Sequence, residues 1–342
     1  MSRLKQLAIL LLFFIFLSFM VTITIAHTPL NPEGEIHSLD TAFEVTNPTK
    51  SWTLYRELQH EGEVEYYKLY LNSGEKLRVS LYIKERKENF APHLIIMGEN
   101  FQLPASLPSF IEIPDGYGAR LIEPTMPEKP EFEPFTPASY YYLIDIDETI
   151  LNEGDYYLAT YNPDLKEGKY GIAIGYKEEF TLSEWLLIPF DVIGIHEWEG
   201  QSLIVILMPM LLSLVLGLVL LAWKLTRKLN IFNILGIVAG LFCVGSGLML
   251  FMQMLFALYG AVFNWLVVLT MVFIALPLSI GFVLLKRSLQ VEGELSKKDR
   301  FFFLILGFAG LFTWSGPLFG PYIAIIVGIL PNRFLRNRQF TK

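Results

Sequence analysis

The feature that most constrains this chain is a change of composition at Glu199-Gly200-Gln201. Before this point, residues 27–200 are polar and patterned like β-strands, and after it the chain is a series of apolar runs. About 20 consecutive apolar residues span the hydrocarbon core of a bilayer as a helix, and these runs reach that length. The sequence therefore predicts one part that folds in water and a second part that folds in lipid.

Charge is divided in the same way. Residues 27–200 contain 13 Lys and Arg against 31 Asp and Glu, a net charge of −18, whereas the rest of the chain contains 14 against 3, a net charge of +11. Lys and Arg concentrate in the cytoplasmic loops of membrane proteins, so we predict a multi-pass protein of the cell membrane with residues 27–200 extracytoplasmic. A surface this acidic repels phosphate, which argues against nucleic acid as a partner.

Residues 1–26 have the pattern of a signal peptide or of an N-terminal membrane anchor. Arg3 and Lys5 precede an apolar run over 7–25, and Ala26 supplies a small residue at a cleavage position. The run is also long enough to remain as an uncleaved anchor. Both alternatives place the chain from residue 31 onward outside the cytoplasm.

Residues 27–179 carry the signals of short strands separated by turns. The alternation is clearest in 75–83, where every second residue from Leu77 onward is apolar. Two hairpins are expected, one formed by 64–71 and 75–83 and the other by 154–161 and 169–176. With about seven short strands and no strong helix, the expected fold of this part is an all-β antiparallel sandwich.

An irregular insert at 104–137 interrupts this pattern. It holds eight of the 19 prolines of the chain. Proline cannot donate to a strand ladder, so the insert is expected to be mostly loop, with an edge piece at 119–122. Its role is open at this stage between a lid, an interface and packing.

Residues 180–200 are expected to form an elbow rich in aromatic residues at the membrane surface. Thr181 and Glu184 have the spacing of a capping box that starts a helix. Pro189 is expected to interrupt that helix after its first turn or two. Trp and Tyr favour the level of the lipid headgroups, and aromatic side chains recur through this segment.

Residues 201–330 are expected to form a helical transmembrane bundle. Gly236 and Gly240 have the spacing that lets helices approach closely, so this helix face is a candidate surface for a partner protein. The expected spans are 201–223, 231–259 and 262–285, followed by a broken segment at 301–330. The first three spans contain no Asp, Glu, Lys or Arg, which weighs against a proton- or ion-coupled transporter.

The segment 301–330 raises a question of sidedness. A single crossing would place the basic tail at 331–342 outside the cytoplasm, against the positive-inside rule. Ser315-Gly316-Pro317 and Gly320-Pro321 break the run near its middle. We therefore favour a hairpin of two short helices that returns the tail to the cytoplasm.

Part of the chain resembles a known kind of domain. In 62–77 a Gly-x-x-x-Tyr-Tyr strand is followed by a glycine-bearing turn and an alternating strand. This stretch resembles the central hairpin of the pre-peptidase C-terminal-type β-sandwich, and 154–159 and 168–173 are similar to its closing hairpin, although the insert departs from that compact domain. The whole architecture resembles uncharacterised prokaryotic, in particular archaeal, membrane proteins. The resemblance implies a binding or accessory sandwich and supplies no catalytic residues.

The sharpest candidate site is a metal site at His27 and His37. Cleavage after Ala26 would make His27 the N-terminal residue, whose amine and imidazole suit Cu(II), with His37 completing the set of nitrogen ligands. The other interpretation of His27 is an ordinary histidine that follows a membrane anchor.

Two further groups of residues in the sequence are candidate ligand-binding or proton-binding sites. Asp145 and Asp147 share one face of an expected strand and offer oxygen ligands for Ca²⁺, although a solvated strand face is the simpler interpretation. His196 and Glu197 form a candidate proton-responsive pair. The other interpretation of these residues is a solvated loop near the membrane.

The leading hypothesis from the sequence is an integral membrane protein, not an enzyme, whose acidic sandwich binds a partner or an envelope component. The alternative is a copper-binding or redox accessory protein that uses His27. A transporter subunit is a third and weaker hypothesis.

Overall fold

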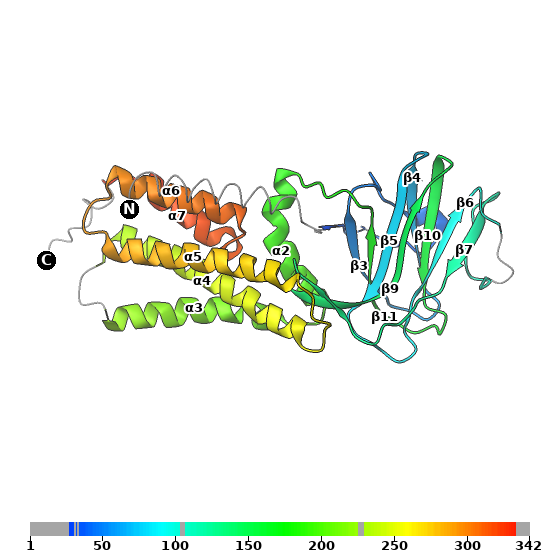
Figure 1. Cartoon of the computed structure of the whole chain (residues 1–342), viewed down its shortest axis with the longest axis horizontal. Coiled ribbons are helices and arrows are strands. Elements are labelled where there is room, and N and C mark those ends of the chain that lie inside the picture. Colours follow the sequence, from blue (N-terminus) through cyan, green and yellow to red (C-terminus); the bar gives the residue numbers. More distant parts are fainter. Residues whose placement is uncertain (1–26, 31, 33, 103–106, 225–228, 333–342) are drawn as a thin grey trace. The chain divides into compact units, whose positions relative to one another are not determined.

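The structure is a computed structural model that describes residues 27–30, 32, 34–102, 107–224 and 229–332. The chain forms two compact units, one built mainly of strands and one mainly of helices (Figure 1). The first unit contains the chain up to Ile83, Lys87–Met126 and Leu143–Phe180, and the second contains Lys84–Arg86, Pro127–Tyr142 and the chain from Thr181. The expected signal or anchor at 1–26 and residues 333–342 of the expected basic tail lie outside the described residues.

The strands form two mixed, largely antiparallel sheets, which confirms the predicted fold class. Two strand pairs, β1 with β3 and β2 with β4, are parallel. The six-stranded sheet has the order β1 (Thr28–Pro29), β3 (Trp52–Leu58), β11 (Gly168–Ile174), β5 (Lys76–Ile83), β9 (Ala138–Thr149) and β8 (Glu131–Glu133). The five-stranded sheet has the order β2 (Phe43–Glu44), β4 (Val64–Leu71), β10 (Gly154–Tyr161), β6 (His93–Gly98) and β7 (Gly118–Ile122).

The two expected hairpins are wrong as strand pairings. β4 and β5 follow one another through Asn72-Ser73-Gly74, but they lie in different sheets, and β10 and β11 are separated in the same way. β10 pairs instead with β4, and β11 pairs with β5. A turn signal specifies that the chain reverses direction, whereas the choice between pairing and crossing to the facing sheet depends on the whole core.

The first half of the proline-rich insert covers one face of the five-stranded sheet. The backbone N–H of Glu112 donates to the hydroxyl of Tyr66 at 2.8 Å. β7, which contains the expected edge piece at 119–122, ends this sheet. Four apolar side chains of the insert pack on the sheet residues Tyr66, Ile95 and Ala159, namely Leu107, Ile111, Ile113 and Tyr117.

The second half of the insert belongs to the helical unit. Phe132 is buried among apolar residues of the helices α4 (Ile231–Leu258) and α5 (Val267–Gln290). The carbonyl oxygen of Pro130 accepts from Val262 N at 2.9 Å, and that of Pro134 accepts from the Thr270 hydroxyl at 2.8 Å. The insert therefore serves as packing in both units.

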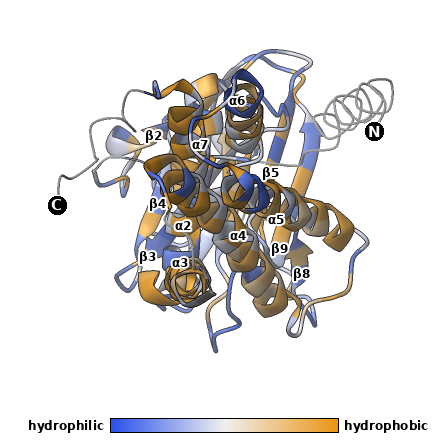
Figure 2. Cartoon of the chain, turned by 90° about the vertical axis from the view of Figure 1, so that its left-hand side faces the viewer, coloured by the Kyte–Doolittle hydropathy of each residue, from blue (hydrophilic) through white to orange (hydrophobic). Residues whose placement is uncertain are grey.

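Among the residues that the structure describes, three helices are long and apolar enough to cross a membrane: α3 (Leu203–Lys224), α4 and α5. Figure 2 shows these helices coloured mostly hydrophobic. Long apolar helices of this kind indicate a lipid bilayer as their surroundings. The other helices of the described chain are α2 (Leu182–Trp198), α6 (Lys297–Phe312) and α7 (Phe319–Ile329), with short 3₁₀ turns at Leu39–Thr41 and Gly316–Leu318.

The glycine face of α4 is occupied within the chain. A Cβ atom at Gly236 would lie 2.1 Å from the Ser288 hydroxyl, and one at Gly240 would lie 2.9 Å from the Gly281 carbonyl oxygen. Both contacts are with α5, so the close helix approach predicted from the spacing is made inside the bundle. The suggestion that the Gly236/Gly240 face receives a partner protein is corrected accordingly.

The expectation that Pro189 stops the helix is also wrong, because α2 continues through it to Trp198. Its start agrees with the sequence, since Thr181 and Glu184 form the capping box. Proline has no N–H to donate to the carbonyl four residues earlier, which is that of Trp185. The indole N–H of Trp314 donates to this carbonyl at 2.8 Å.

The segment 301–330 contains two short helices that run side by side in opposite directions. A Cβ atom at Gly328 would meet Leu304, whereas one at Gly310 would meet Pro321. These reversed contacts show that α6 and α7 pack as a hairpin. How this hairpin lies in the membrane stays a prediction.

Candidate functional site

The most deeply buried charged group of the sheet unit is the carboxylate of Glu65, whose side chain has no exposed area. Glu65 lies on β4, on the inward face that also carries Tyr67 and Leu69. The Arg56 guanidinium on β3 forms an ion pair with it, and Arg56 Nε lies 3.0 Å from both carboxylate oxygens. A buried carboxylate needs such a partner, because burying an isolated charge is very unfavourable.

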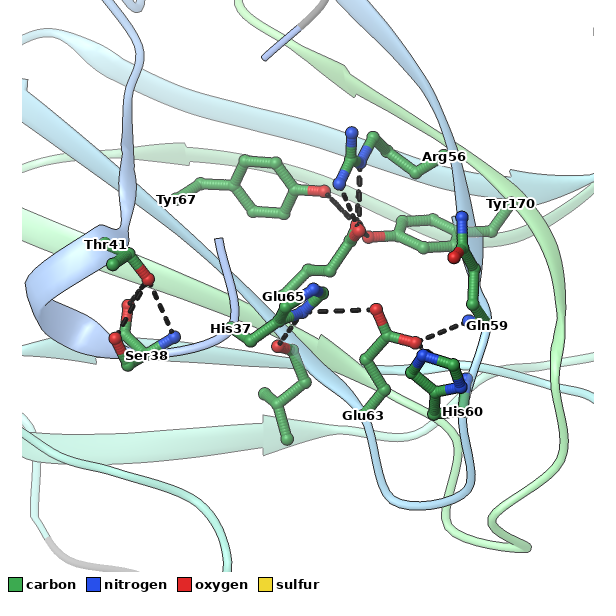
Figure 3. A network of polar contacts seen from close by, with 11 residues as sticks. His37, Ser38, Thr41, Arg56, Gln59, His60, Glu63, Glu65, Tyr67 and Tyr170 are labelled. Carbon is green, nitrogen blue, oxygen red and sulfur yellow. Dashed lines mark hydrogen bonds and ion pairs between the residues drawn. The ribbon is translucent and has the colours of Figure 1, made fainter. Parts of the chain in front are cut away.

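Two tyrosine hydroxyls complete the cluster (Figure 3). Tyr67 on β4 donates to Glu65 at 3.0 Å, and Tyr170 on β11 also donates to Glu65. The two hydroxyls are 2.7 Å apart and come from different sheets, so this cluster joins the sheets through the core. Burial, followed by the nearby charge of Glu65, raises the pKa of both tyrosines well above the usual value.

His37, Glu63 and Glu65 lie close enough together to suggest a metal site, with one ligand atom of each within 4.8 Å of the others. The surroundings do not fit a cation. Glu65 already accepts from Arg56, Tyr67 and Tyr170, and the guanidinium would lie next to any metal bound there. We therefore interpret the Glu65 cluster as a structural tie between the sheets.

The structure gives the two predicted copper ligands different partners. His27 Nδ1 lies 2.5 Å from the Ser51 hydroxyl, whereas His37 Nδ1 lies 3.2 Å from a Glu63 carboxylate oxygen. Burial, with a smaller effect from the positive charge of Arg78, lowers the pKa of His27 to about 4. Within the described chain no hydrogen bond joins the two histidines, so the copper site stays a prediction.

The acidic residues on β9 each have a separate partner. Asp145 accepts from the Ser80 hydroxyl at 2.8 Å, and Asp147 lies 3.0 Å from Lys76 Nζ. Glu148, next along the strand, pairs with Arg120 at 2.7 Å. Asp145 and Asp147 therefore match a solvated strand face with partners on the neighbouring strand β5, whereas the partner of Glu148 lies on β7 of the other sheet.

A second buried cluster lies in the helical unit, at the end of α2. His196 Nδ1 and a carboxylate oxygen of Glu199 are 2.9 Å apart, and both side chains are at most 2% exposed. Lys84 Nζ lies 3.2 Å from the other carboxylate oxygen. The partner of His196 is therefore Glu199, three residues on, and the sequence-based pair with Glu197 is not formed. The helical i, i+3 spacing is the signal that points to Glu199.

The backbone explains why this pair can form. Glu199 caps α2, and Gly200 follows with φ +95°, a conformation that favours glycine. Gly200 N donates to Glu197 O, and Gln201 N donates to His196 O at 3.0 Å, which is a Schellman motif. The junction that divides the sequence is thus a defined helix cap rather than a flexible linker.

The chemistry of the His196–Glu199 pair follows from its hydrogen bonds. Burial alone would raise the pKa of Glu199, but the hydrogen bond and charge of His196 and the charge of Lys84 lower it. An ionised carboxylate can only accept, so His196 Nδ1 carries the proton. His196 Nε2 is buried and has no hydrogen-bond partner among the described residues.

Two amide side chains extend this cluster toward α4. Gln201 and Gln253 donate to each other, at 2.9 Å and 2.8 Å. Gln253 lies within α4, so this pair satisfies a buried amide inside a candidate span. Gln253 is a polar residue in an apolar run of the sequence, but nothing in the surrounding residues indicates Gln201 as its partner.

Together these features define a class of protein: a two-sheet β domain joined to a helical region with three candidate membrane-spanning helices. No protein-family model matches the chain, and no curated protein matches it.

Proposed function

We propose that this chain is an integral membrane protein that holds an acidic β-sandwich outside the cytoplasm, where the sandwich binds a partner protein or a component of the cell envelope. The observation that supports this most is the union of the two-sheet unit with helices of 21, 28 and 24 residues that are apolar enough to cross a membrane. Apolar helices exposed to this degree need lipid around them: of α3, only 11% is buried.

Charge supports the proposed sidedness and the kind of partner. The net charge of residues 27–200 is −18, whereas the rest of the chain carries +11. Basic residues near spans favour the cytoplasmic side. An acidic surface attracts and orients a partner of positive charge, so we expect binding that weakens as salt is added.

The interior of the sandwich supports a binding role rather than a catalytic one. The Glu65 carboxylate is occupied by Arg56 and two tyrosines, and the carboxylates of β9 are paired on the surface. The resemblance to the pre-peptidase C-terminal-type sandwich also implies a binding or accessory domain. We therefore assign the proposed contact to the outer surface of the sandwich.

Site-specific photo-crosslinking in living cells tests this proposal. A crosslinking side chain is introduced at Tyr70 or Leu151, which are 52% and 80% exposed on the sheet unit. The matched control is Trp223, which is 80% exposed at the end of α3. We expect a discrete adduct from the sandwich positions that weakens at high salt. Adducts from Trp223 alone, or none from the sandwich, would contradict the proposal.

The copper-binding or redox alternative depends on His27 becoming the first residue. The position of His27 just before β1 does not itself favour a metal, since its imidazole contacts Ser51. Mass spectrometry of the purified chain tests the alternative directly. An intact N-terminus ends it, and cleavage after Ala26 together with one bound copper per chain supports it.

A further inference from the structure

A cavity of about 330 Å³ lies between the end of α5 and the start of α6. On α5, four lining residues recur at spacings of three and four, so they share one helix face. The two lining residues of α6 are four apart and share a face as well. The lining residues are Val283, Lys286, Arg287 and Gln290 of α5 and Lys298 and Phe302 of α6.

The lining of this cavity is strongly basic. It contains three cationic side chains and no carboxylate. Arg287 has an ion-pair partner in Asp299, but no hydrogen bond or ion pair to Lys286 or Lys298 is found in the part of the chain that the structure describes. The cavity therefore has two ammonium groups available for an anion.

The start of α6 adds to this positive potential. Ser296 caps the helix, and Lys298 lies in its first turn. The N-terminus of a helix carries a partial positive charge and favours a negative ligand. The carboxylate of Asp299, in the same turn, forms an ion pair with Arg287 and accepts a hydrogen bond from the Ser296 hydroxyl at 2.6 Å.

The opposite end of the cavity is apolar. Val283 is 41% exposed. The ring of Phe302 lies against the Arg287 guanidinium, and the distance from its ring centroid to Arg287 Cζ is 6.0 Å. From Val283 to Gln290 the helix rises by about 10 Å. Along this length the lining changes from the apolar part of a membrane-spanning helix to its charged end. A soluble phosphate would use only the basic end, whereas a phospholipid matches both ends.

We propose that the cavity between α5 and α6 binds an anionic phospholipid. The phosphate and the acidic headgroup lie between Lys286, Arg287 and Lys298. The acyl chains leave along Val283 and Phe302 toward the hydrocarbon core. Basic pockets between membrane helices bind acidic headgroups in this way.

Adjacent lysines provide a matched test. Lys297 and Lys298 are neighbours and both are exposed, but only Lys298 lines the cavity. The full chain in detergent micelles is titrated with dioleoyl phosphatidylglycerol and with dioleoyl phosphatidylcholine, and binding is followed by native mass spectrometry. We expect K298Q and K286Q each to weaken phosphatidylglycerol binding about fivefold, and K286Q/K298Q about 25-fold, because each lysine contributes to attraction of an acidic headgroup.

Several results would overturn the proposal. Equal losses in K297Q and K298Q would show unspecific attraction by the basic surface. Equal binding of phosphatidylcholine would show that the charges of the cavity do not select the lipid. Displacement of phosphatidylglycerol by millimolar inorganic phosphate would identify a phosphate site rather than a lipid site. Each variant is first required to keep the thermal midpoint of the unchanged chain, so that a loss of binding reports on the cavity.

Discussion

The indole N–H of Trp314 donates to the backbone carbonyl of Trp185, 2.8 Å away. That carbonyl is the one that Pro189 deprives of its helical partner, because residue 189 would otherwise donate to residue 185. The rings of Trp185 and Trp314 also lie 4.3 Å apart between centroids. Trp314, in the turn after α6, therefore supplies the Trp185 carbonyl with a donor in place of the N–H that residue 189 lacks, and α2 continues through Pro189.

A double-mutant cycle tests this relationship. Trp314→Phe keeps an aromatic ring but removes the donor, so we expect it to destabilise the chain by about 1–2 kcal/mol. In a Pro189→Ala background the new N–H can donate to Trp185 O, and the same change is expected to cost less than half as much. Thermal unfolding in detergent micelles measures both differences. An equal loss in the two backgrounds would mean that the hydrogen bond does not compensate for the proline.

The Glu65 cluster is expected to stabilise the sheet unit strongly. Glu65→Gln leaves the Arg56 guanidinium without its carboxylate, and we expect a loss of about 3 kcal/mol, the lower end of the range for breaking a buried pair, because Arg56 keeps some contact with water. The matched control is Glu57→Gln, on the exposed side of β3, with a change below about 0.5 kcal/mol. Thermal midpoints compare the two variants. Equal midpoints would refute the structural role of the Glu65 cluster.

The depressed pKa of His27 predicts a pH dependence of stability. Between its folded pKa of about 4 and the ordinary value of 6.5, the unfolded chain binds a proton that the folded chain does not. Stability is therefore expected to fall as the pH is lowered from 6.5 to 4, by at most about 2.6 kcal/mol from this residue. The profile of His27→Gln is expected to be flatter over this range. A His27→Gln profile parallel to that of the unchanged chain would contradict the lowered pKa of His27.

The contact between α4 and α5 is expected to tolerate no side chain at Gly281. A Cβ atom there would lie 2.7 Å from the Gly240 carbonyl oxygen. We expect Gly281→Ala to destabilise the bundle by about 1–3 kcal/mol, because the helices must move apart. Gly194→Ala in α2 is the control, since nothing lies within 4 Å of a Cβ atom at that position. Heat stability of the solubilised chain, followed by size-exclusion chromatography, distinguishes the two. Similar losses would show that the close approach is unimportant.

Sequence reasoning succeeded where the signal is local. The Thr181–Glu184 capping box, β4 at 64–71 and the positions of the three long helices follow from spacing and composition alone. It failed where the deciding partner is distant. Pro189 was expected to end a helix because Trp314, 125 residues later, is not visible as a hydrogen-bond donor in the local pattern.

The sequence contains a signal that Glu65 is buried. The alternation that places Tyr67 and Leu69 inward also places Glu65 inward, although a carboxylate in a strand is usually taken as solvent-exposed. Arg56 and Tyr170 could not be identified as its partners, because the strand order brings them together only in the folded sheets. The pairing of His196 with Glu199 could not be predicted from the sequence, because it requires α2 to extend to Trp198.

The sidedness of the two units is the central claim, and labelling of single cysteines tests it most directly. Cys243, the only cysteine of the chain, is replaced by alanine, and one cysteine is introduced at Leu151 or at Lys297. We expect a membrane-impermeant maleimide to label the Leu151 position in intact cells and the Lys297 position only after permeabilisation. Labelling of Lys297 in intact cells, with Leu151 protected until permeabilisation, would contradict the proposed orientation.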